Sequence, residues 1–294
     1  MSPEQLLIIG GNGRFGTLLS NLLSHAGHVV NGIDLQHAPA SEARFSRYVS
    51  SDVLSPSPEA TSLIQESGCI VLSLPEEVTL NCFPGLVEVL KEGSLLVDLL
   101  SVKSAIVTLM KNVEKPVELL SLHPMFAPQV GFAGQNVVAI EVRPGRRTAA
   151  LLTLLKSFGA RLTLMTADQH DAATAAIQVA THAALISFGL ALRGMNYDVE
   201  QALSVSAPPH RLMLMLFARI LAGDPEIYWR IQVEHPLSAS TRDVLKQSLV
   251  NLNAAISEHD FETFKALLES ARVLIAPEQE NLISYGAQVM KVEM

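Results

Sequence analysis

A short glycine-rich segment near the start of the chain restricts the fold more than any other feature of the sequence. The letters "GGNGRFG" (10–16) follow the apolar run "LLII" and precede a segment with helical spacing, "GTLLSNLLSHAG" (16–27). Within it, Gly11, Gly13 and Gly16 form the pattern G-x-G-x-x-G. In this pattern the first glycine permits a tight turn, the second lets a pyrophosphate approach the backbone, and the third lets the helix pack on the strand. The segment therefore predicts a strand, a phosphate-binding turn and a helix.

A second predicted strand, His28–Leu35, carries Asp34 near its end, about 20 residues after the turn, as dinucleotide-binding units require. A carboxylate there accepts hydrogen bonds from the adenosine ribose and repels a 2′-phosphate, which favours NAD over NADP. The alternative is a glycine-rich turn with a surface aspartate. We expect the cofactor to contact this turn, this carboxylate and the exit of a later strand, at Gly11, Gly13, Arg14, Phe15, Gly16, Asp34, Ser73, Leu74 and Pro75. For the last three, an ordinary strand exit is the alternative.

Apolar runs alternate with helical segments through the first half of the chain. Further strands are predicted at Cys69–Pro75, Ser94–Leu100, Val117–Pro124, Asn136–Val142 and Ala160–Thr166, with a helix at Arg147–Phe158. Near-continuous apolar strands separated by helices are typical of a parallel sheet that helices cover on both faces. The prediction is an α/β fold whose first domain, residues 1–166, is a doubly wound, Rossmann-type sheet.

From Asp168 onward the pattern is helical, and we predict an all-helical domain over residues 167–294. Helices are expected at Asp168–Arg193, Val199–Ser204, Pro209–Ala222, Pro225–Glu234, Pro236–Glu258 and Asp260–Ala276. The stretch Ala172–Leu192 has no Asp, Glu, Lys or Arg and is long enough to span a membrane. Its alanine content and its polar residues favour instead a buried helix of a soluble domain.

Composition excludes some classes of partner. The formal net charge is −8, which disfavours nucleic acids and anionic membrane surfaces. The two cysteines, Cys69 and Cys82, lack the spacing of a metal or redox site. We therefore expect a cytoplasmic protein with reduced thiols and no bound metal.

Two predicted strands end in residues that carry chemistry. "DLLSVKS" (98–104) brings Ser101 and Lys103 to the carboxyl edge of the sheet, and "LHPMFAP" (122–128) brings His123 there. Ligands bind at this edge in doubly wound sheets. The prolines after His123 restrict the backbone, as a fixed general base would require. A lone histidine beside a strand can also be a structural polar group.

The sequence resembles the prephenate dehydrogenase family. The resemblance rests on "IIGGNGRFG", "VDLLSVKS", "LHPMFAP", "HDAATAAIQVATH" and "FARILAGDPEIYW", which are spread between Ile8 and Trp229. It implies an NAD-dependent oxidative decarboxylation of prephenate to 4-hydroxyphenylpyruvate, in the tyrosine branch of aromatic amino acid biosynthesis. It also implies a homodimer formed through the helical domain and a small dicarboxylate as substrate.

The resemblance also implies roles for individual residues. His123 would take the proton of the C4 hydroxyl, and Ser101 would hold that hydroxyl and the histidine. Arg219 would bind a substrate carboxylate, because arginine recognises carboxylates bidentately. Further substrate contacts would come from Gln178, His182 and Lys103.

Structural roles are the alternatives for several of these residues. Arg219 could form a surface ion pair, although its apolar neighbours favour a partly buried guanidinium with an anionic partner. His182 could be a core or dimer-interface histidine. We assign His170 to the start of a helix, with Asp168 as its cap.

The substrate stays open at this point. Gln129 stands at a position that is often acidic in the family, and Ala127 at one that is usually glycine. The first difference favours a keto side chain over arogenate, or else indicates a homologue that acts on 4-amino-4-deoxyprephenate. Competing classes are a 3-hydroxyacid dehydrogenase or imine reductase, and a non-catalytic NAD-binding protein. The 3-hydroxyacid dehydrogenases have a lysine on the interdomain helix, and Asp168–Arg193 has none.

Overall fold

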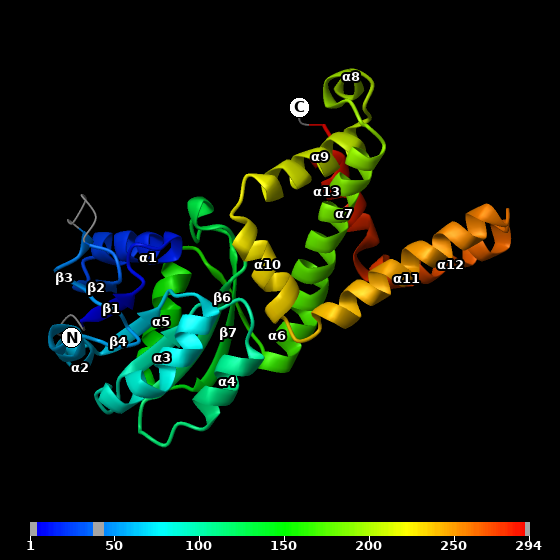
Figure 1. The fold of residues 1–294 in the computed structure, drawn as a ribbon. Coiled ribbons are helices and arrows are strands. Elements are labelled where there is room, and N and C mark those ends of the chain that lie inside the picture. The colour runs from blue at the N-terminus through cyan, green and yellow to red at the C-terminus, as the bar shows by residue number, and fades with distance from the viewer. Residues whose placement is uncertain (1–4, 38–43, 292–294) are drawn as a thin grey trace. The chain divides into compact units, whose positions relative to one another are not determined.

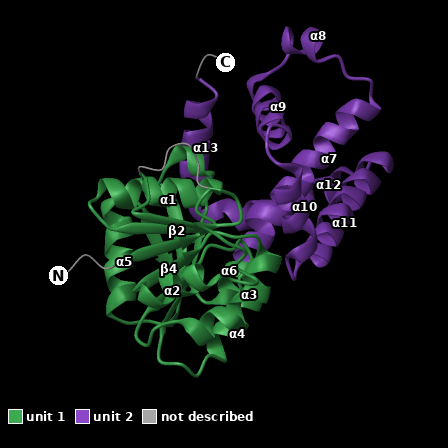
Figure 2. Cartoon of the chain, turned by 60° about the vertical axis from the view of Figure 1, so that its left-hand side comes forward, with its two compact units in different colours: residues 1–171 green, residues 172–294 purple. Residues whose placement is uncertain are grey.

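The computed structural model describes residues 5–37 and 44–291 and divides the chain into two compact units. Unit 1 is Met1–Asp171 and unit 2 is Ala172–Met294 (Figure 2). The division falls within a helix, a few residues after the predicted boundary at residue 166. Each unit has its own architecture, and the first carries the sheet.

Unit 1 contains one eight-stranded sheet with the order β3-β2-β1-β4-β5-β6-β7-β8 (Figure 1). The strands are β1 (Leu6–Ile9), β2 (Val30–Asp34), β3 (Arg47–Ser50), β4 (Cys69–Leu72), β5 (Leu95–Asp98), β6 (Glu118–Pro124), β7 (Asn136–Arg143) and β8 (Arg161–Leu164). Its helices are α1 (Arg14–His25), α2 (Pro58–Glu66), α3 (Glu76–Val89), α4 (Ser104–Lys111), η2 (Pro128–Val130) and α5 (Arg146–Ser157), and α6 (Ala167–Thr174) ends it. The predicted doubly wound α/β fold is confirmed.

The six strands between the edge strands β3 and β8 contribute side chains to two separate cores, because successive residues of a strand point to opposite faces of the sheet. In β1, Leu7 and Ile9 pack into the core under α2, α3 and α4. Leu6 and Ile8 pack into the core under α1 and α5. This burial on both faces explains why the central strands are apolar without interruption.

Two features of the sheet differ from the sequence prediction. β7 runs antiparallel to β6, whereas a parallel sheet was predicted. The connection between them, 125–135, contains only the short η2 and no crossover helix, so the chain must turn back. The edge strand β3 was not predicted, because only Val49 of its four residues is buried.

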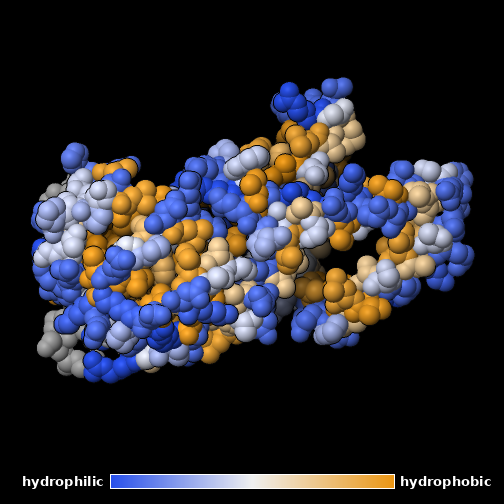
Figure 3. Space-filling model, turned by 60° about the horizontal axis from the view of Figure 1, so that its bottom comes forward, coloured by the Kyte–Doolittle hydropathy of each residue, from blue (hydrophilic) through white to orange (hydrophobic). Residues whose placement is uncertain are grey.

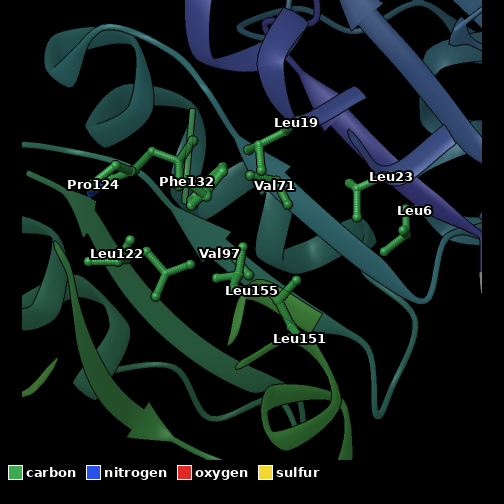
Figure 4. Close-up of a pocket in the computed structure, with 12 residues that line it drawn as sticks. Leu6, Leu19, Leu23, Val71, Val97, Leu122, Pro124, Phe132, Leu151 and Leu155 are labelled. Carbon is green, nitrogen blue, oxygen red and sulfur yellow. The ribbon is translucent and has the colours of Figure 1, made fainter. Parts of the chain in front are cut away.

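The core between α1, α5 and the sheet contains a small void of about 20 Å³ (Figure 4). Apolar side chains line it, among them Leu19, Leu23, Leu151 and Leu155 from the two helices and Val97 from β5. A void of this size with apolar walls is a packing defect of the core rather than a ligand site. The chemistry of unit 1 lies elsewhere, at the carboxyl edge of the sheet.

In the described part of unit 2 every regular element is helical, as predicted. The elements are η3 (Ala175–Ala180), α7 (Thr181–Gly194), α8 (Val199–Leu203), α9 (Pro208–Leu221), α10 (Pro225–Glu234), α11 (Ser238–Ser257), α12 (Phe261–Ile275), η4 (Ala276–Glu278) and α13 (Gln279–Val289). Helix α13 was not predicted. α7 and α9 pack closely at Gly189, where a Cβ would lie 2.0 Å from the Phe217 ring.

Residues Ala167–Gly194 form one helical stretch of 28 residues that combines α6, η3 and α7. By length and composition alone this stretch could cross a membrane, and core helices of soluble proteins meet the same test. Only 28% of its apolar window is buried within the chain. The prediction of a buried helix is therefore wrong for the single chain.

The middle of this stretch, η3, is a π-helix. Such segments insert an extra residue into a helical turn and often occur at functional sites. The sequence analysis predicted one uninterrupted helix here and did not anticipate this segment.

Candidate active site

The turn after β1 depends on two glycines. Gly10 has φ +85°, and a Cβ there would lie 2.2 Å from the carbonyl oxygen of Ser73. A Cβ on Gly16 would lie 2.2 Å from the Gly10 oxygen. The sequence analysis assigned the tight turn to Gly11, but the residue in the left-handed region is Gly10. The close approach joins the ends of β1 and β4, where the strand order reverses and ligands bind in such sheets.

The turn leads directly into α1. Gly13 is the N-cap, and its oxygen accepts a hydrogen bond from the Thr17 N–H at 2.8 Å. Arg14 and Phe15 are the first helical residues, followed by Gly16. The first N–H groups of a helix have no intrahelical acceptor and lie at the positive end of its dipole. The turn therefore has the geometry of a pyrophosphate site.

Asp34 ends β2 beside this turn. Its carboxylate accepts hydrogen bonds from the Asn12 N–H at 2.9 Å and from the Gln36 N–H at 3.1 Å. The guanidinium of Arg44 donates to the Asn12 side-chain oxygen at 3.1 Å and lies 5.0 Å from the centre of the Phe45 ring. The sequence analysis missed Asn12 and Arg44, because no short motif places them beside Asp34.

The exit of β4 carries the other predicted cofactor contacts. Ser73 donates its N–H to the Ile9 oxygen at 2.8 Å, which ties the exit to β1. Ser73 and Leu74 are half-buried, and Pro75 is the N-cap of α3. Ser73 and Leu74 lie against Gly10 of the glycine turn. Contact of these residues with a cofactor stays a prediction.

A chain of hydrogen bonds leads from His123 to an aspartate. Nδ1 of His123 lies 2.8 Å from Nε2 of His170, and Nδ1 of His170 lies 2.7 Å from Oδ1 of Asp171. All three side chains are buried. His123 is paired with Val138 of β7, one residue before β6 ends. The sheet therefore fixes His123, in addition to the prolines that the sequence analysis invoked.

Asp171 has a second function as a cap of α4. Its carboxylate accepts hydrogen bonds from the Lys103 N–H at 3.1 Å, from the Ser104 N–H at 3.0 Å and from the Ser104 hydroxyl. Burial raises the pKa of Asp171, but the hydrogen bonds from His170, Ser104 and the backbone outweigh it and lower the pKa to about 2. The group is thus a carboxylate at physiological pH.

His170 was assigned to the start of a helix with Asp168 as the cap. It does lie in the first turn of α6, but Asp168 is not the cap. Thr166 provides the cap: its hydroxyl accepts from the Gln169 N–H at 3.2 Å, and the Gln169 side-chain oxygen accepts from the Thr166 N–H at 3.0 Å. This capping box forms the start of α6, and the His170 side chain points at His123. The adjacent residues His170 and Asp171, "HD" in the sequence, could have indicated this hydrogen-bonded pair.

Lys103 does not have the environment expected of a substrate contact. Its ammonium group is fully buried and donates to Asp98 Oδ1 and to the Leu122 oxygen, each at 2.8 Å. Burial lowers the pKa of Lys103, and the charge of Asp98 opposes this effect. Lys103 thus forms an internal ion pair with Asp98 at the end of β5 and a hydrogen bond to the backbone of β6.

The pKa of His123 lies well below 6.5. Burial is the main cause, followed by the positive charge of Lys103 and by His170, while Asp171 acts in the opposite direction. The imidazole is therefore neutral at physiological pH, the state in which a histidine can accept a proton.

Ser101 lies between β5 and α4 and is half-buried. Within the described residues no hydrogen bond joins its hydroxyl to His123. Its predicted role in holding the histidine stays a prediction, and Nδ1 of His123 contacts His170.

The remaining predicted substrate residues lie in unit 2. Gln178 is in the π-helical segment η3, and His182 is one turn further along in α7. The His182 ring lies edge-on to Tyr228 with 5.1 Å between centroids, and burial lowers its pKa. Arg219 is in the last turn of α9 and is exposed. The expected partly buried guanidinium is not found in the single chain.

Two family models match the chain. The prephenate dehydrogenase nucleotide-binding domain matches residues 21–143, and the prephenate dehydrogenase dimerization domain matches residues 166–270. The chain belongs to the prephenate dehydrogenase family. The nucleotide-binding domain corresponds to most of unit 1, and the dimerization domain begins shortly before α6.

Relatives of this chain carry different names. A 4-amino-4-deoxyprephenate dehydrogenase from Streptomyces pristinaespiralis is 38% identical over 266 residues, covering 90% of this chain and 89% of that protein. A T-protein from Enterobacter agglomerans is 32% identical over 232 residues, covering 78% of this chain and 56% of the relative.

Solved structures of the family share the fold. The crystal structure of prephenate dehydrogenase from A. aeolicus, in complex with hydroxyphenyl propionate and NAD+, superposes with a TM-score of 0.73. The two chains are 17% identical, and the match covers 94% of this chain and 99% of the other. The likeness at this identity shows the common fold.

The buried pair of Lys103 and Asp98 gives a test of their structural role. Lys103→Met leaves a buried carboxylate without its cation, and we expect the free energy of unfolding to fall by about 3–5 kcal/mol. The double variant Lys103→Met/Asp98→Asn removes both charges and should recover part of that loss. Urea unfolding of the full chain at pH 7 measures both. A single variant as stable as the parent would contradict the ion-pair assignment.

Proposed function

We propose that this protein catalyses the NAD-dependent oxidative decarboxylation of prephenate to 4-hydroxyphenylpyruvate, a step toward tyrosine. One observation carries the proposal within this family: a buried, neutral imidazole, His123, stands at the carboxyl edge of a nucleotide-binding sheet and is oriented by a second buried histidine. A neutral and fixed imidazole is the group that a proton-abstracting step needs. We further propose that the enzyme is soluble and cytoplasmic.

The residues of the glycine turn fit a dinucleotide. Gly10 and Gly16 allow the close backbone contacts of the turn, where a Cβ would collide. The first N–H groups of α1 are available for phosphate oxygens, and Asp34 stands at the end of β2. Asp34 would accept hydrogen bonds from the adenosine ribose. When bound, NAD would supply the acceptor for the hydride that leaves C4 of the substrate.

The protein's own groups would bind and orient the substrate and move its proton. His123 would accept the C4 hydroxyl proton as C4 is oxidised and would return it when the phenol forms. Ser101 would hold the hydroxyl. Arg219 would bind a carboxylate, because prephenate carries two, and Gln178 and His182 would contact the side chain. Aromatisation of the ring drives the loss of carbon dioxide, so orientation is the main task of the site.

A second candidate substrate is 4-amino-4-deoxyprephenate. The 38% identity to the Streptomyces pristinaespiralis enzyme of that name favours it. Arogenate is the third candidate within the family. The three molecules share the ring and its carboxylate and differ in the group at C4 or in the side chain, so one chemistry and one cofactor serve all of them.

The roles of His123 and Arg219 should separate kinetically. His123→Asn removes a group that acts as charge develops at the C4 oxygen, so we expect kcat to fall by about 10²–10⁴-fold with little change in KM. Arg219→Gln removes a contact present in ground and transition states. Its KM should rise by roughly 10- to 150-fold, since a charge-assisted hydrogen bond contributes about 1.5–3 kcal/mol.

Steady-state NADH formation from prephenate, arogenate and 4-amino-4-deoxyprephenate measures these effects and identifies the substrate. His25→Asn and Arg193→Gln, which change an exposed histidine and an exposed arginine, are the matched controls. With the 4-amino compound there is no hydroxyl to deprotonate, so loss of His123 should matter less. Full turnover of prephenate by His123→Asn would refute the assignment of a base.

Cofactor preference should depend on Asp34 and Arg44 together. Asp34→Ser removes the charge that repels a 2′-phosphate and leaves Arg44, already beside Asn12, as a cation for it. We expect this variant to shift kcat/KM toward NADP, and the double variant Asp34→Ser/Arg44→Ala to show a smaller shift. A parent enzyme that prefers NADP would contradict the role given to Asp34.

We also propose that the enzyme is a homodimer held together by its helical unit. Large apolar side chains are exposed along these helices, including Val273 at 75%, Leu274 at 82% and Ile283 at 63%. Figure 3 shows hydrophobic residues, in orange, on the surface of the molecule. Apolar surface of this extent is typical of an interface. The match to a family model named for dimerization supports the same conclusion.

Light scattering at micromolar concentration should give a mass of twice 31.7 kDa. Leu274→Asp places a charge on the apolar surface and should shift the mass toward the monomer. Leu54→Asp, at an apolar side chain of unit 1 that is 51% exposed, is the control and should stay dimeric. A monomeric parent protein would rule out the proposed assembly.

A further inference from the structure

The hydrogen-bonded chain of His123, His170 and Asp171 has a defined direction. Their side chains are nearly inaccessible, with 4%, 0% and 3% of their surface exposed. The distances between the linked atoms are 2.8 Å and 2.7 Å, and β6 and α6 hold the two histidines. Because these side chains are buried, each of the two hydrogen bonds must have one donor and one acceptor.

The protons can be assigned from the aspartate end. Asp171 is ionised and can only accept, so the proton of the second bond belongs to Nδ1 of His170. In a neutral His170, Nε2 then carries a lone pair and accepts from His123. The proton of the first bond therefore belongs to Nδ1 of His123, and Nε2 of His123 carries the lone pair.

We propose that His170 and Asp171 are positioning residues that hold His123 in its basic tautomer and take up its second proton during the reaction. The proposal rests on the proposed function for the reaction itself, while the tautomer is a property of the enzyme alone. Neither His170 nor Asp171 was among the residues that the sequence indicated for the site.

The proton balance is simple. As the C4 hydroxyl loses its proton, a bond forms from that proton to Nε2 of His123. The Nδ1–H bond of His123 breaks, and the same proton bonds to Nε2 of His170. The positive charge then lies on His170 beside the Asp171 carboxylate. Return of the proton to the phenolic oxygen reverses both transfers and restores the enzyme.

The surrounding charges explain why the charge moves away from His123. The Lys103 ammonium, on the segment before α4, disfavours a cation on His123. Asp98 of β5 is hydrogen-bonded to that ammonium, and Glu76 of α3 also acts on it. Asp171 is the carboxylate in direct contact with the histidine chain. A proton on His170 is therefore better compensated than one on His123.

The kinetic test uses His170→Gln, whose amide oxygen can accept from His123 but cannot hold a proton. We expect kcat on the active substrate to fall roughly 10- to 100-fold, with KM and NAD affinity within about twofold of the parent. Loss of the positive charge of His170 by itself would raise the pKa of His123. If His170 instead takes up the second proton, the acid limb of the kcat/KM profile should move toward lower pH in His170→Gln, because the proton can no longer pass to the group beside Asp171. Asp171→Asn should move the limb in the same direction.

Asp168→Asn is the matched control, since it makes the same charge change at an exposed position on the same turn of α6. It should leave kcat and the pH profile unchanged. A His170→Gln enzyme with a lower kcat but an unmoved acid limb would show that His170 only supports the fold, and would overturn the proposal.

The tautomer is measured on the parent enzyme without any substrate. Selective ¹⁵N-histidine labelling and long-range ¹H–¹⁵N correlation at pH 7.5, assigned with His123→Gln, should give the Nδ1–H form for His123. An Nε2–H form would overturn the proposal whatever the variants do. If the enzyme oxidised none of the three acids, the proposed function would fail, and this spectrum would still decide the tautomer.

Discussion

The interaction on which the rest of the site depends is the Asp171 carboxylate. It joins two parts of unit 1 that are far apart in sequence: it accepts from the Lys103 and Ser104 N–H groups at the start of α4, and it orients His170 on its own helix. A buried carboxylate is costly unless it is fully hydrogen-bonded. Because these donors satisfy it, one negative charge fixes the start of α4 and the direction of the imidazole chain at once.

The sheet puts this network in the right place. The order of the strands reverses between β1 and β4, so the glycine turn and the exit of β4 meet at one crevice, and β5 and β6 deliver Asp98 and His123 to the same edge. The buried pair of Lys103 and Asp98 then links β5 to the backbone of β6. The glycine turn and His123 are thus fixed by one rigid scaffold.

Much of the fold was predictable because it follows from local patterns. Apolar runs such as Leu6–Ile9 identify buried strands, and a glycine pattern after a strand identifies the turn. The edge strand β3 was missed because it buries one residue, and the direction of β7 was missed because it depends on a missing crossover helix. Lys103 was assigned to the substrate because the sequence does not reveal that its ammonium group is buried and paired with Asp98.

The sequence by itself determined the two-part architecture, the phosphate-binding turn and the placement of His123 at the end of a strand. These depend on residue spacing within single elements, and spacing is visible in one dimension. Tertiary structure alone decided that His170 contacts His123, that Gly10 adopts the left-handed conformation, and that Lys103 is internal. Each of these depends on a contact between segments separated along the chain, where burial and hydrogen-bond geometry, not local propensity, select the partner.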